Sequence, residues 1–587
     1  MLLQRLVEYA SRDPEAKPFH RSRQFQWELR IDQQGKLLSA QVESLLTNDI
    51  KGKPRGADHV VPATVRTVGV APNLAADDVQ YVLGWSDADT RPERVAQCHQ
   101  AFVDLIYRWA ESPEGRDDSV AQAVAAFYRS GGLTSLPRDD SCTAKQGVLI
   151  TVVDDSGGRV PAYRAPSVVP FWSGEVAQRK GGNGQGLCLV CGKIRPLLET
   201  VPGKVPGRLV PGASNDAALV SINERVFGYD LTTQLGCSPI CISCGEAVSA
   251  GLGHVLSSSY STSYGGQDSR LAWWTTEDVP SNPMLPVFDA APEDVNALLA
   301  SPRRGRFEDD ELDEAMFCAL TVGGNVARVM VRDWLEMPLG ELRAHIVAWF
   351  ADHQMTPLFR QENEYHSLQR FVLVTGRWLR REKRYAPIGA KGADRPDNVQ
   401  RDLLRAAMRG TPLPPSLLAH LVHRVQTDGR LDTPRASLIR LALMRSPLMK
   451  ENVMPGLDPN NTDPAYVSGR IFAALEALQY DASGGKLNTT YADRYFAGAI
   501  TNPRAALVNG RKDAKAWLRK LRGNRRGAAV NHEKTLDSLF ELLPAEAIPA
   551  RASLKQQSLF LLGYHHQRAH RFAALGEAKP TTEEIPA

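Results

Sequence analysis

The sequence has no apolar run long enough to cross a membrane, few cysteines and almost no net charge. A membrane span would need roughly 18 or more apolar residues, and the 587-residue chain contains no such run. Eight cysteines are too few for a disulfide scaffold. Lys and Arg number 70 against 66 Asp and Glu, and the resulting charge of +4 argues against a protein that coats nucleic acid over its whole surface.

Signals for export and for known catalytic mechanisms are also missing. The first 13 residues read as a short amphipathic helix and not as a signal peptide, so we expect a cytoplasmic protein without membrane contact. The phosphate loop GxxxxGK[ST], HExxH and GxSxG do not occur. His566 and His570 have the i, i+4 spacing of metal ligands, but a basic, partly exposed helix face explains them better. The acidic segment 308–314 is best explained as a solvated face, so the motif content favours a non-catalytic binding protein.

Residues 1–400 predict an α+β region. Hydrophobic residues make up 43% of the chain, enough for several packed domains. Trp273 and Trp274 are expected in the core, as are Cys98, Cys142 and Cys318. Residues 25–32, 79–85, 146–155 and 270–276 are predicted strands, and residues 96–110 a predicted helix.

The strand pattern ends near residue 400 and helical patterns replace it. Three short helices, separated by Gly and Pro, predict a helical connector over residues 401–450. After a Pro- and Asn-rich break at 446–464, four amphipathic stripes predict an all-α C-terminal four-helix bundle over residues 454–575. Residues 576–587 are expected to form a disordered tail.

Two short cysteine motifs predict a structural zinc site. CLVCG at 188–192 and CISCG at 241–245 each place two thiols two residues apart and follow them with glycine. Cys188, Cys191, Cys241 and Cys244 would supply the four sulfurs of a zinc-ribbon insertion over about residues 185–247, although Cys237 could replace one of them. Four thiolates leave no open position on the metal, which makes such a zinc structural and not hydrolytic.

The positive charge is concentrated near the C-terminus. Residues 454–587 carry a net charge of +5 and the rest of the chain −1, while residues 511–526 alone hold eight cations and one acid. Ala514, Trp517, Leu518 and Leu521 define a buried stripe at helical spacing and leave cations on the opposite side. The predicted nucleic-acid contacts are Arg511, Lys512, Lys515, Arg519, Lys520, Arg522, Arg525 and Arg526.

Several long blocks resemble one known family. They are MLLQRLVEYA at the start, RTVGVAPNLAADDVQYVLG (66–84), the central block 210–247, GNVARVMVRDW (324–334), and residues 403–425 and 458–499. In order and over nearly the whole chain, these blocks resemble the large subunit of the type I-C CRISPR interference complex (Cascade), with a C-terminal bundle similar to the small subunit.

The resemblance implies a non-catalytic subunit that recognises the protospacer-adjacent motif on duplex DNA. Such a subunit promotes unwinding and R-loop formation, stabilises the displaced strand and recruits a helicase-nuclease. The implied partners are guide RNA (crRNA), target double-stranded DNA, the backbone and crRNA-end-capping subunits, separate small subunits and the helicase-nuclease.

The resemblance also implies roles for residues outside the bundle. Residues 1–400 would form the DNA-recognition region. Asn73 would read the motif, because Gly and Pro in the loop GVAPN (69–73) can shape a thin loop that enters a groove, although residues 66–84 could instead be a turn into a buried strand. Lys51, Lys53 and Arg55 would contact duplex phosphates nearby. Met449 and Met454 would each be a candidate internal translation start for the small subunit. The competing hypotheses are a zinc-stabilised nuclease or nucleic-acid-processing enzyme acting alone and a zinc-ribbon transcription regulator that binds DNA without guide RNA.

Overall fold

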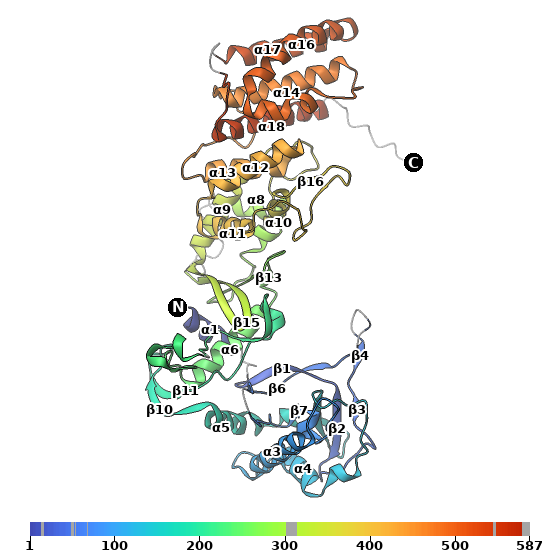
Figure 1. The fold of residues 1–587 in the computed structure, drawn as a ribbon, viewed down its shortest axis with the longest axis vertical. Coiled ribbons are helices and arrows are strands. Elements are labelled where there is room, and N and C mark those ends of the chain that lie inside the picture. The colour runs from blue at the N-terminus through green and yellow to red at the C-terminus, as the bar shows by residue number, and fades with distance from the viewer. Residues whose placement is uncertain are drawn as a thin grey trace. The chain divides into compact units, whose positions relative to one another are not determined.

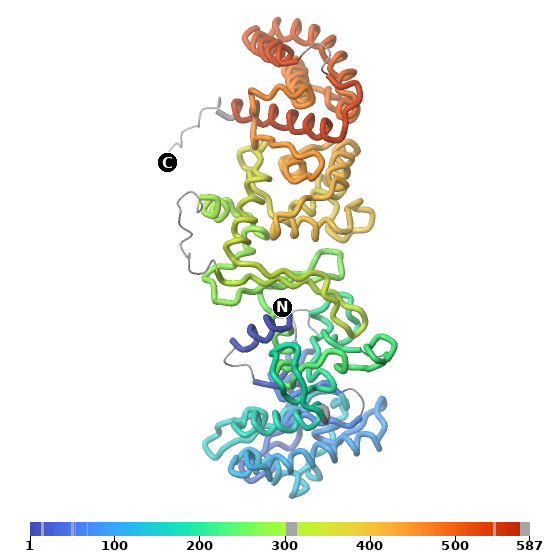
Figure 2. Tube along the Cα trace, turned by 90° about the vertical axis from the view of Figure 1, so that its left-hand side faces the viewer, coloured from blue at the N-terminus to red at the C-terminus, as the bar shows by residue number. Residues whose placement is uncertain are grey.

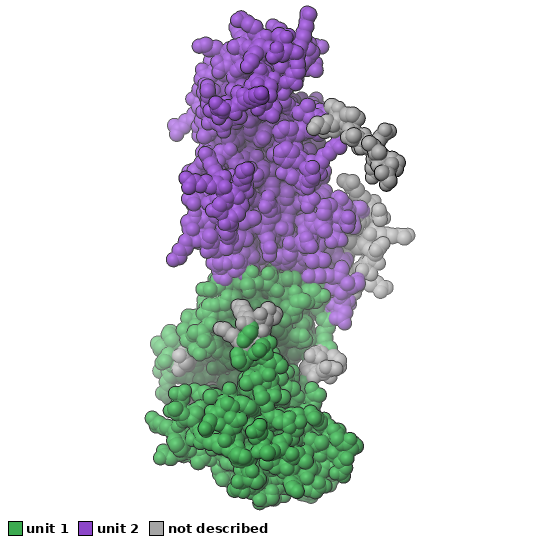
Figure 3. Space-filling model, turned by 90° about the vertical axis from the view of Figure 1, so that its right-hand side faces the viewer, with its two compact units in different colours: residues 1–263, 268–276, 318–335 green, residues 264–267, 277–317, 336–587 purple. Residues whose placement is uncertain are grey.

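The chain folds into two compact units, which Figure 3 colours separately. The computed structural model describes residues 1–12, 17–48, 52, 54–66, 69–222, 224–300, 314–543 and 548–577. Unit 1 comprises residues 1–263, 268–276 and 318–335, and unit 2 comprises residues 264–267, 277–317 and 336–587. Every helix in these described ranges is too short or too polar to span a bilayer.

The N-terminal part of unit 1 is built on a five-stranded mixed sheet. Its order is β3-β2-β8-β7, with β9 added to β8, and β2 and β8 run parallel from Trp27 beside Val148 to Asp32 beside Val153. Alternate residues of β2 are buried, as one covered sheet face requires. Strands β1 and β6, and β4 and β5, form separate two-stranded ribbons. The strands are β1 (His20–Phe25), β2 (Trp27–Asp32), β3 (Glu43–Ser44), β4 (Thr47–Asn48), β5 (Pro54–Arg55), β6 (Ala57–Pro62), β7 (Ala76–Asp78), β8 (Gly147–Val153) and β9 (Arg159–Pro161).

Helices cover this sheet and complete its core. Helix α4 packs against β2 and β8, and α3 packs against α2 and α4 (Figure 1). Phe102, Trp109 and Phe127 are fully buried in the shared core, and Cys98 and Cys142 are buried in it as predicted. The helices are α2 (Val79–Val82), α3 (Pro92–Glu111), α4 (Ser119–Arg129) and α5 (Val168–Lys180).

The predicted strand at 79–85 is wrong. The chain forms strand β7 just before it and then turns into the short helix α2. Val79 and Val82 are fully buried in the core, so their β-branched side chains pack against it from a helical turn. Tertiary packing overrides strand propensity in so short a segment.

A second sheet and the cysteine segment form the remainder of unit 1. The sheet order is β12-β15-β14-β13, and helices α1 and α6 pack against each other beside it. Trp273, Trp274 and Cys318 are buried here, which confirms their prediction as core residues. The elements are α1 (Leu2–Ser11), β10 (Gly181–Leu187), β11 (Ile194–Leu198), β12 (Ala213–Ala218), α6 (Ile242–Ser257), β13 (Ser261–Ser263), β14 (Arg270–Thr275) and β15 (Met316–Pro338).

The first helices of unit 2 pack around a buried ionic cluster. The Arg435 guanidinium is fully buried and donates to Asp428 at 2.7 Å and to the Val374 and Gly376 carbonyls at 3.0 and 2.8 Å. The three helices predicted between 401 and 450 are confirmed as α11 to α13. The elements are α7 (Leu285–Phe288), α8 (Pro292–Ala300), α9 (Leu339–His353), α10 (Leu368–Val374), β16 (Trp378–Leu379), β17 (Arg384–Tyr385), α11 (Val399–Arg409), α12 (Pro415–Asp428) and α13 (Thr433–Met444).

The C-terminal region is helical, as predicted, but within its described residues it holds five helices where the sequence indicated four. The additional helix is α15, whose start is fixed by a capping box between Thr490 and Asp493. Only four of its residues are buried, so its apolar stripe is short. The helices are α14 (Pro464–Ala482), α15 (Tyr491–Thr501), α16 (Pro503–Asn524), α17 (Arg526–Glu541) and α18 (Leu554–Glu577).

Helix α14 lies at the centre of this region and is buried on almost every side. Glycines let it approach α18 closely, because a Cβ on Gly469 would lie 2.0 Å from the Phe560 carbonyl oxygen. Figure 2 shows α18 as one continuous helix, which contacts both α14 and α13. The prediction of a partly exposed helix face is wrong for His566, which is fully buried on α18 with Nδ1 2.9 Å from the Tyr466 hydroxyl. His570 is exposed.

Candidate metal centre and nucleic-acid interface

The four predicted cysteine ligands meet in one cluster. The Sγ atoms of Cys188, Cys191, Cys241 and Cys244 all lie within 4.8 Å of one another. Cys188 and Cys191 occupy the turn between β10 and β11, where Gly192 has a φ of +67° that favours glycine. Cys241 is the residue before helix α6 and Cys244 lies in its first turn. The second pair therefore starts a helix, whereas the expected zinc ribbon would place it on a second β-turn.

Backbone hydrogen bonds hold the two cysteine pairs together and favour ionisation of one thiol. The Cys241 N–H donates to Cys188 Sγ at 3.3 Å, although the residues are 53 positions apart. Burial opposes ionisation of Cys188, but backbone N–H groups of Cys191, Cys241 and Val190 outweigh it and lower the Cys188 pKa to about 6. Burial and the neighbouring Cys241 instead raise the Cys244 pKa. A cation among the four sulfurs would favour the thiolate of each cysteine.

The cluster has the chemistry of a structural metal site. Three of its sulfurs belong to buried residues, and Cys191 is half-buried. Four closely spaced cysteine sulfurs match the ligand set of tetrahedral structural zinc. Cys237 lies outside the cluster, where its Sγ is 2.7 Å from the Thr232 hydroxyl and accepts the Tyr229 N–H at 2.9 Å.

The predicted cationic helix is α16, and its cations face solvent. Ala514 and Leu521 are buried, and Trp517 and Leu518 are half-buried. We define the α16 basic face as the exposed residues Arg511, Lys512, Lys515, Arg519, Lys520 and Arg522.

Most of these cations are not neutralised. Arg511 lies 4.9 Å from the centre of the Phe540 ring, and Arg522 pairs with Glu533 at 2.6 Å. Among the residues placed by the structure, Lys512, Lys515, Arg519 and Lys520 have no ion-pair partner. Next to this face, Arg526 is exposed and also has no described ion-pair partner, while Arg525 is exposed and lies 3.9 Å from the Asp481 carboxylate. The surface therefore keeps cations available for phosphate groups.

The upstream candidates occupy different environments. Lys51 and Lys53 lie outside the described residues. Arg55 is exposed on β5 and pairs with Asp58 at 2.5 Å. Asn73 is only 3% exposed, and its side-chain oxygen accepts the Thr64 N–H at 3.2 Å. The base contact of Asn73 stays a prediction, and it would require the loop to open because the amide is buried here. The burial and the strand β7 that follows agree with the alternative of a turn into a buried strand.

A paired-carboxylate cluster beside Asn73 escaped the sequence analysis. Asp77 is fully buried and accepts the Asn73 N–H at 2.8 Å, while Arg23 and Arg66 both contact Asp77 and Asp78. Burial and the adjacent Asp77 raise the Asp78 pKa, against the opposing effect of the two arginines. The sequence signal that could have indicated this cluster is the pair of consecutive acids inside an apolar run. The two carboxylates connect β7 to Arg23 of β1 and to Arg66.

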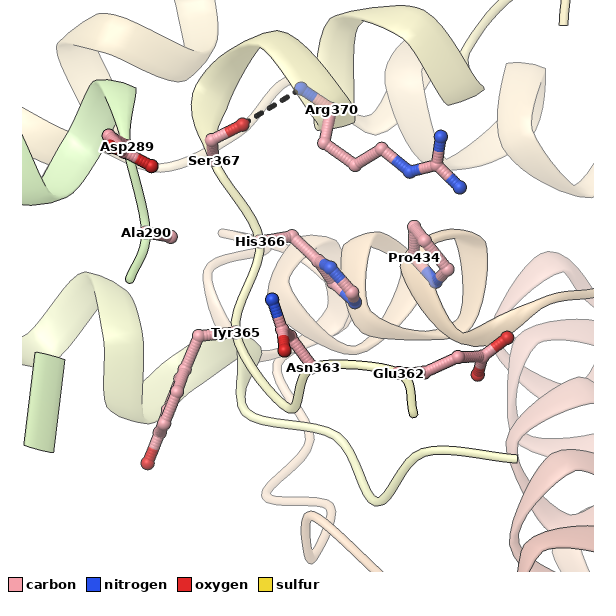
Figure 4. Close-up of a pocket in the computed structure, with 9 residues that line it drawn as sticks. All are labelled: Asp289, Ala290, Glu362, Asn363, Tyr365, His366, Ser367, Arg370 and Pro434. Carbon is pink, nitrogen blue, oxygen red and sulfur yellow. Dashed lines mark hydrogen bonds between the residues drawn. The ribbon is translucent and has the colours of Figure 1, made fainter. Parts of the chain in front are cut away.

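Unit 2 contains a polar pocket of about 300 Å³, drawn in Figure 4 with its lining residues. The Glu362 carboxylate in this pocket already accepts hydrogen bonds from the Leu358 N–H and the Thr433 hydroxyl. Burial lowers the pKa of His366 to about 4, so this imidazole is neutral near pH 7. The Ser367 hydroxyl accepts the Arg370 N–H and caps α10. Glu362 and Ser367 are therefore engaged in local structure.

The two candidate start residues lie between α13 and α14. Met449 is half-buried and Met454 is 57% exposed, both in an irregular segment. A chain beginning at either residue would include all of α14 to α18.

Comparison with known proteins identifies the family. Residues 3–572 match the family model described as CRISPR-associated protein (Cas_Csd1). Because the match covers nearly the whole chain, the protein belongs to this family of CRISPR-associated proteins. No curated protein matches the chain.

Proposed function

We propose that this chain is the non-catalytic large subunit of a type I-C CRISPR surveillance complex (Cascade). It recognises the protospacer-adjacent motif on duplex DNA, promotes unwinding and R-loop formation, stabilises the displaced strand and recruits the helicase-nuclease. The observation that carries this proposal is the family match over residues 3–572. The unneutralised cations of the α16 basic face support it independently.

In such a complex, guide RNA reads the target by base pairing and the protein reads a short motif and the shape of the backbone. The α16 basic face suits the second task, because closely spaced cations bind phosphates without regard to sequence. We assign its contacts to the target and displaced strands. The Arg55 segment of unit 1 would contact duplex phosphates near the motif.

We further propose that Cys188, Cys191, Cys241 and Cys244 bind one structural Zn²⁺. The ion would join the β10–β11 turn to the start of α6, and four protein ligands would leave no position for a reacting water. Its role would be to stabilise the fold.

The function test is co-purification. The chain, co-expressed with guide RNA and the backbone subunits, is expected to yield a complex that contains short RNA of uniform length. That complex should bind target duplex tightly only when the correct flanking motif is present. A chain that never associates with guide RNA would contradict the proposal.

The competing hypothesis is a nuclease that acts alone. The purified chain is therefore incubated with single-stranded and duplex DNA in the presence of Mg²⁺ or Mn²⁺, and we expect both substrates to stay intact. Reproducible cleavage that co-purifies with the chain and is lost on substitution of a specific residue would favour the nuclease. Tight, sequence-specific duplex binding without guide RNA would instead favour a transcription regulator.

A further inference from the structure

An open pocket adjoins the C-terminal end of α16. It has a volume of about 380 Å³, within the range of small-ligand sites, and α14, the turn after it and α16 contribute its walls. Its lining residues are Tyr480, Asp481, Ala482, Ser483, Gly484, Gly485, Lys520, Asn524 and Arg525.

Tyr480 presents an accessible aromatic ring to this pocket. It is 51% exposed at the end of α14, although an aromatic side chain normally gains stability from burial. Within the described part of the chain, its ring contacts no other aromatic ring and its hydroxyl makes no hydrogen bond. Gly485, with a φ of +79°, turns the chain beside it, and a Cβ there would lie 3.1 Å from the tyrosine oxygen. Glycine here lets the turn pass beside the ring without placing a side chain over it, and about half of the tyrosine stays exposed.

Cations dominate the charge around this ring. Lys520 is exposed, and its ammonium has no ion-pair partner among the described residues. The Arg525 guanidinium donates to the Asp481 carbonyl at 3.0 Å and is 56% exposed. The one acid in the lining, Asp481, is paired with Arg571 at 2.9 Å and contacts His532 Nε2 at 2.8 Å. Its negative charge is therefore already compensated.

We infer that this pocket is a nucleotide subsite for single-stranded nucleic acid. One unpaired base stacks on Tyr480, and the flanking phosphates contact Lys520 and Arg525. The Asn524 amide can donate to or accept from the base edge. Aromatic platforms beside cationic tracks are the general means by which proteins hold single strands without sequence preference.

The geometry predicts discrimination against duplex. Bases inside a duplex are stacked on their neighbours and would have to leave the helix to cover Tyr480. The phosphates of either nucleic acid can still reach the α16 basic face. This inference rests on the proposed nucleic-acid role of that face and adds a base contact to it.

The test compares fluorescence anisotropy of the full chain with a 20-nucleotide oligothymidylate and with a blunt duplex of equal length. Tyr480→Ala is expected to weaken single-strand binding at least about fivefold, as loss of one stacking platform does. Tyr480→Phe keeps the ring and should remain within about twofold of the unmodified chain. Duplex affinity and the salt dependence of binding should not change in either variant. Tyr229→Ala removes a different exposed tyrosine, 81% accessible in unit 1, and serves as the matched control.

The outcomes separate this inference from the proposed function. Unchanged single-strand affinity in Tyr480→Ala overturns the nucleotide subsite and leaves the basic face standing. An equal loss on single strand and duplex, or an equal loss in Tyr480→Phe, also overturns it. The proposed role of the basic face fails if Lys512→Gln/Lys515→Gln/Arg519→Gln leaves both probes bound as before. If the unmodified chain binds neither probe, both the nucleotide subsite and the proposed role of the α16 basic face are overturned.

Discussion

The carboxylate of Glu246 accepts two hydrogen bonds from the Arg21 guanidinium, each 2.6 Å long. Glu246 is only 5% exposed and follows Cys244 by two positions in α6. Its carboxylate also accepts the Phe19 N–H at 2.7 Å. This buried contact attaches the helix of the cysteine cluster to strand β1, so the cluster is part of the unit 1 structure and not an independent finger.

Glu246→Gln is expected to destabilise unit 1 by about 3 kcal/mol, because loss of the carboxylate leaves the Arg21 charge without its partner. Urea unfolding followed by tryptophan fluorescence should show a lower midpoint. The matched control is Glu111→Gln, which breaks the exposed Arg129–Glu111 pair and should change the free energy of unfolding by less than about 1 kcal/mol. Equal effects in the two variants would contradict the structural role of Glu246.

The native chain is expected to contain about one zinc per molecule by elemental analysis. Cys188→Ser should lose the metal and lower the thermal stability, since it removes one of four ligands. Cys237→Ser and Cys98→Ser should keep full metal content, because both thiols lie outside the cluster. A native chain without zinc, or metal loss in Cys237→Ser, would refute this ligand assignment.

The variant Lys512→Gln/Lys515→Gln/Arg519→Gln should weaken DNA binding and its salt dependence together. Three lost phosphate contacts would reduce the slope of log affinity against log salt by about two to three. The control Lys555→Gln removes a lysine already paired with Glu451 at 2.5 Å, and its slope should match that of the unmodified chain. An unchanged slope in the triple variant would exclude the α16 basic face as a phosphate contact.

Unit 2 should lose stability in mild acid. Burial lowers the pKa of His366 and His565 to about 4 and the pKa of His353 and His566 well below the ordinary imidazole value. Between about pH 6.5 and pH 4 the unfolded chain binds protons that the folded chain excludes, so stability is retained above this window and falls as pH drops through it.

The measurement is the urea midpoint of unit 2 as a function of pH. The variant His366→Gln/His565→Gln should show a shallower decrease, whereas His423→Gln, which replaces an exposed histidine, should follow the unmodified chain. A midpoint independent of pH over this range would contradict the buried neutral state of these imidazoles.

A short C-terminal product is expected from an internal start at Met449 or Met454. An immunoblot against the C-terminus should detect this product beside the full chain. Met449→Leu/Met454→Leu should abolish it, and the single variants should identify the start. Persistence of the unchanged short product in the double variant would disprove internal initiation at these residues.

Local sequence patterns predicted much of the secondary structure and the chemistry of the site. The spacing of Ala514 and Leu521 identified the buried side of α16, because periodicity along one helix is a local property. The prediction of a strand at 79–85 was wrong because a short apolar run has no periodicity that distinguishes a strand from a buried helical turn. Helix α15 was missed because its stripe is equally short.

The sequence by itself determined the two cysteine pairs and the concentration of cations in residues 511–526. Both consist of neighbouring residues and therefore need no knowledge of the fold. Only the tertiary structure decided that the two cysteine pairs, 53 residues apart, meet in one cluster. It also buried Asn73 and His566, paired Arg21 with Glu246 and left the Tyr480 ring open beside Lys520. Burial and long-range pairing depend on which surfaces pack together, and no local pattern in a single sequence records that choice.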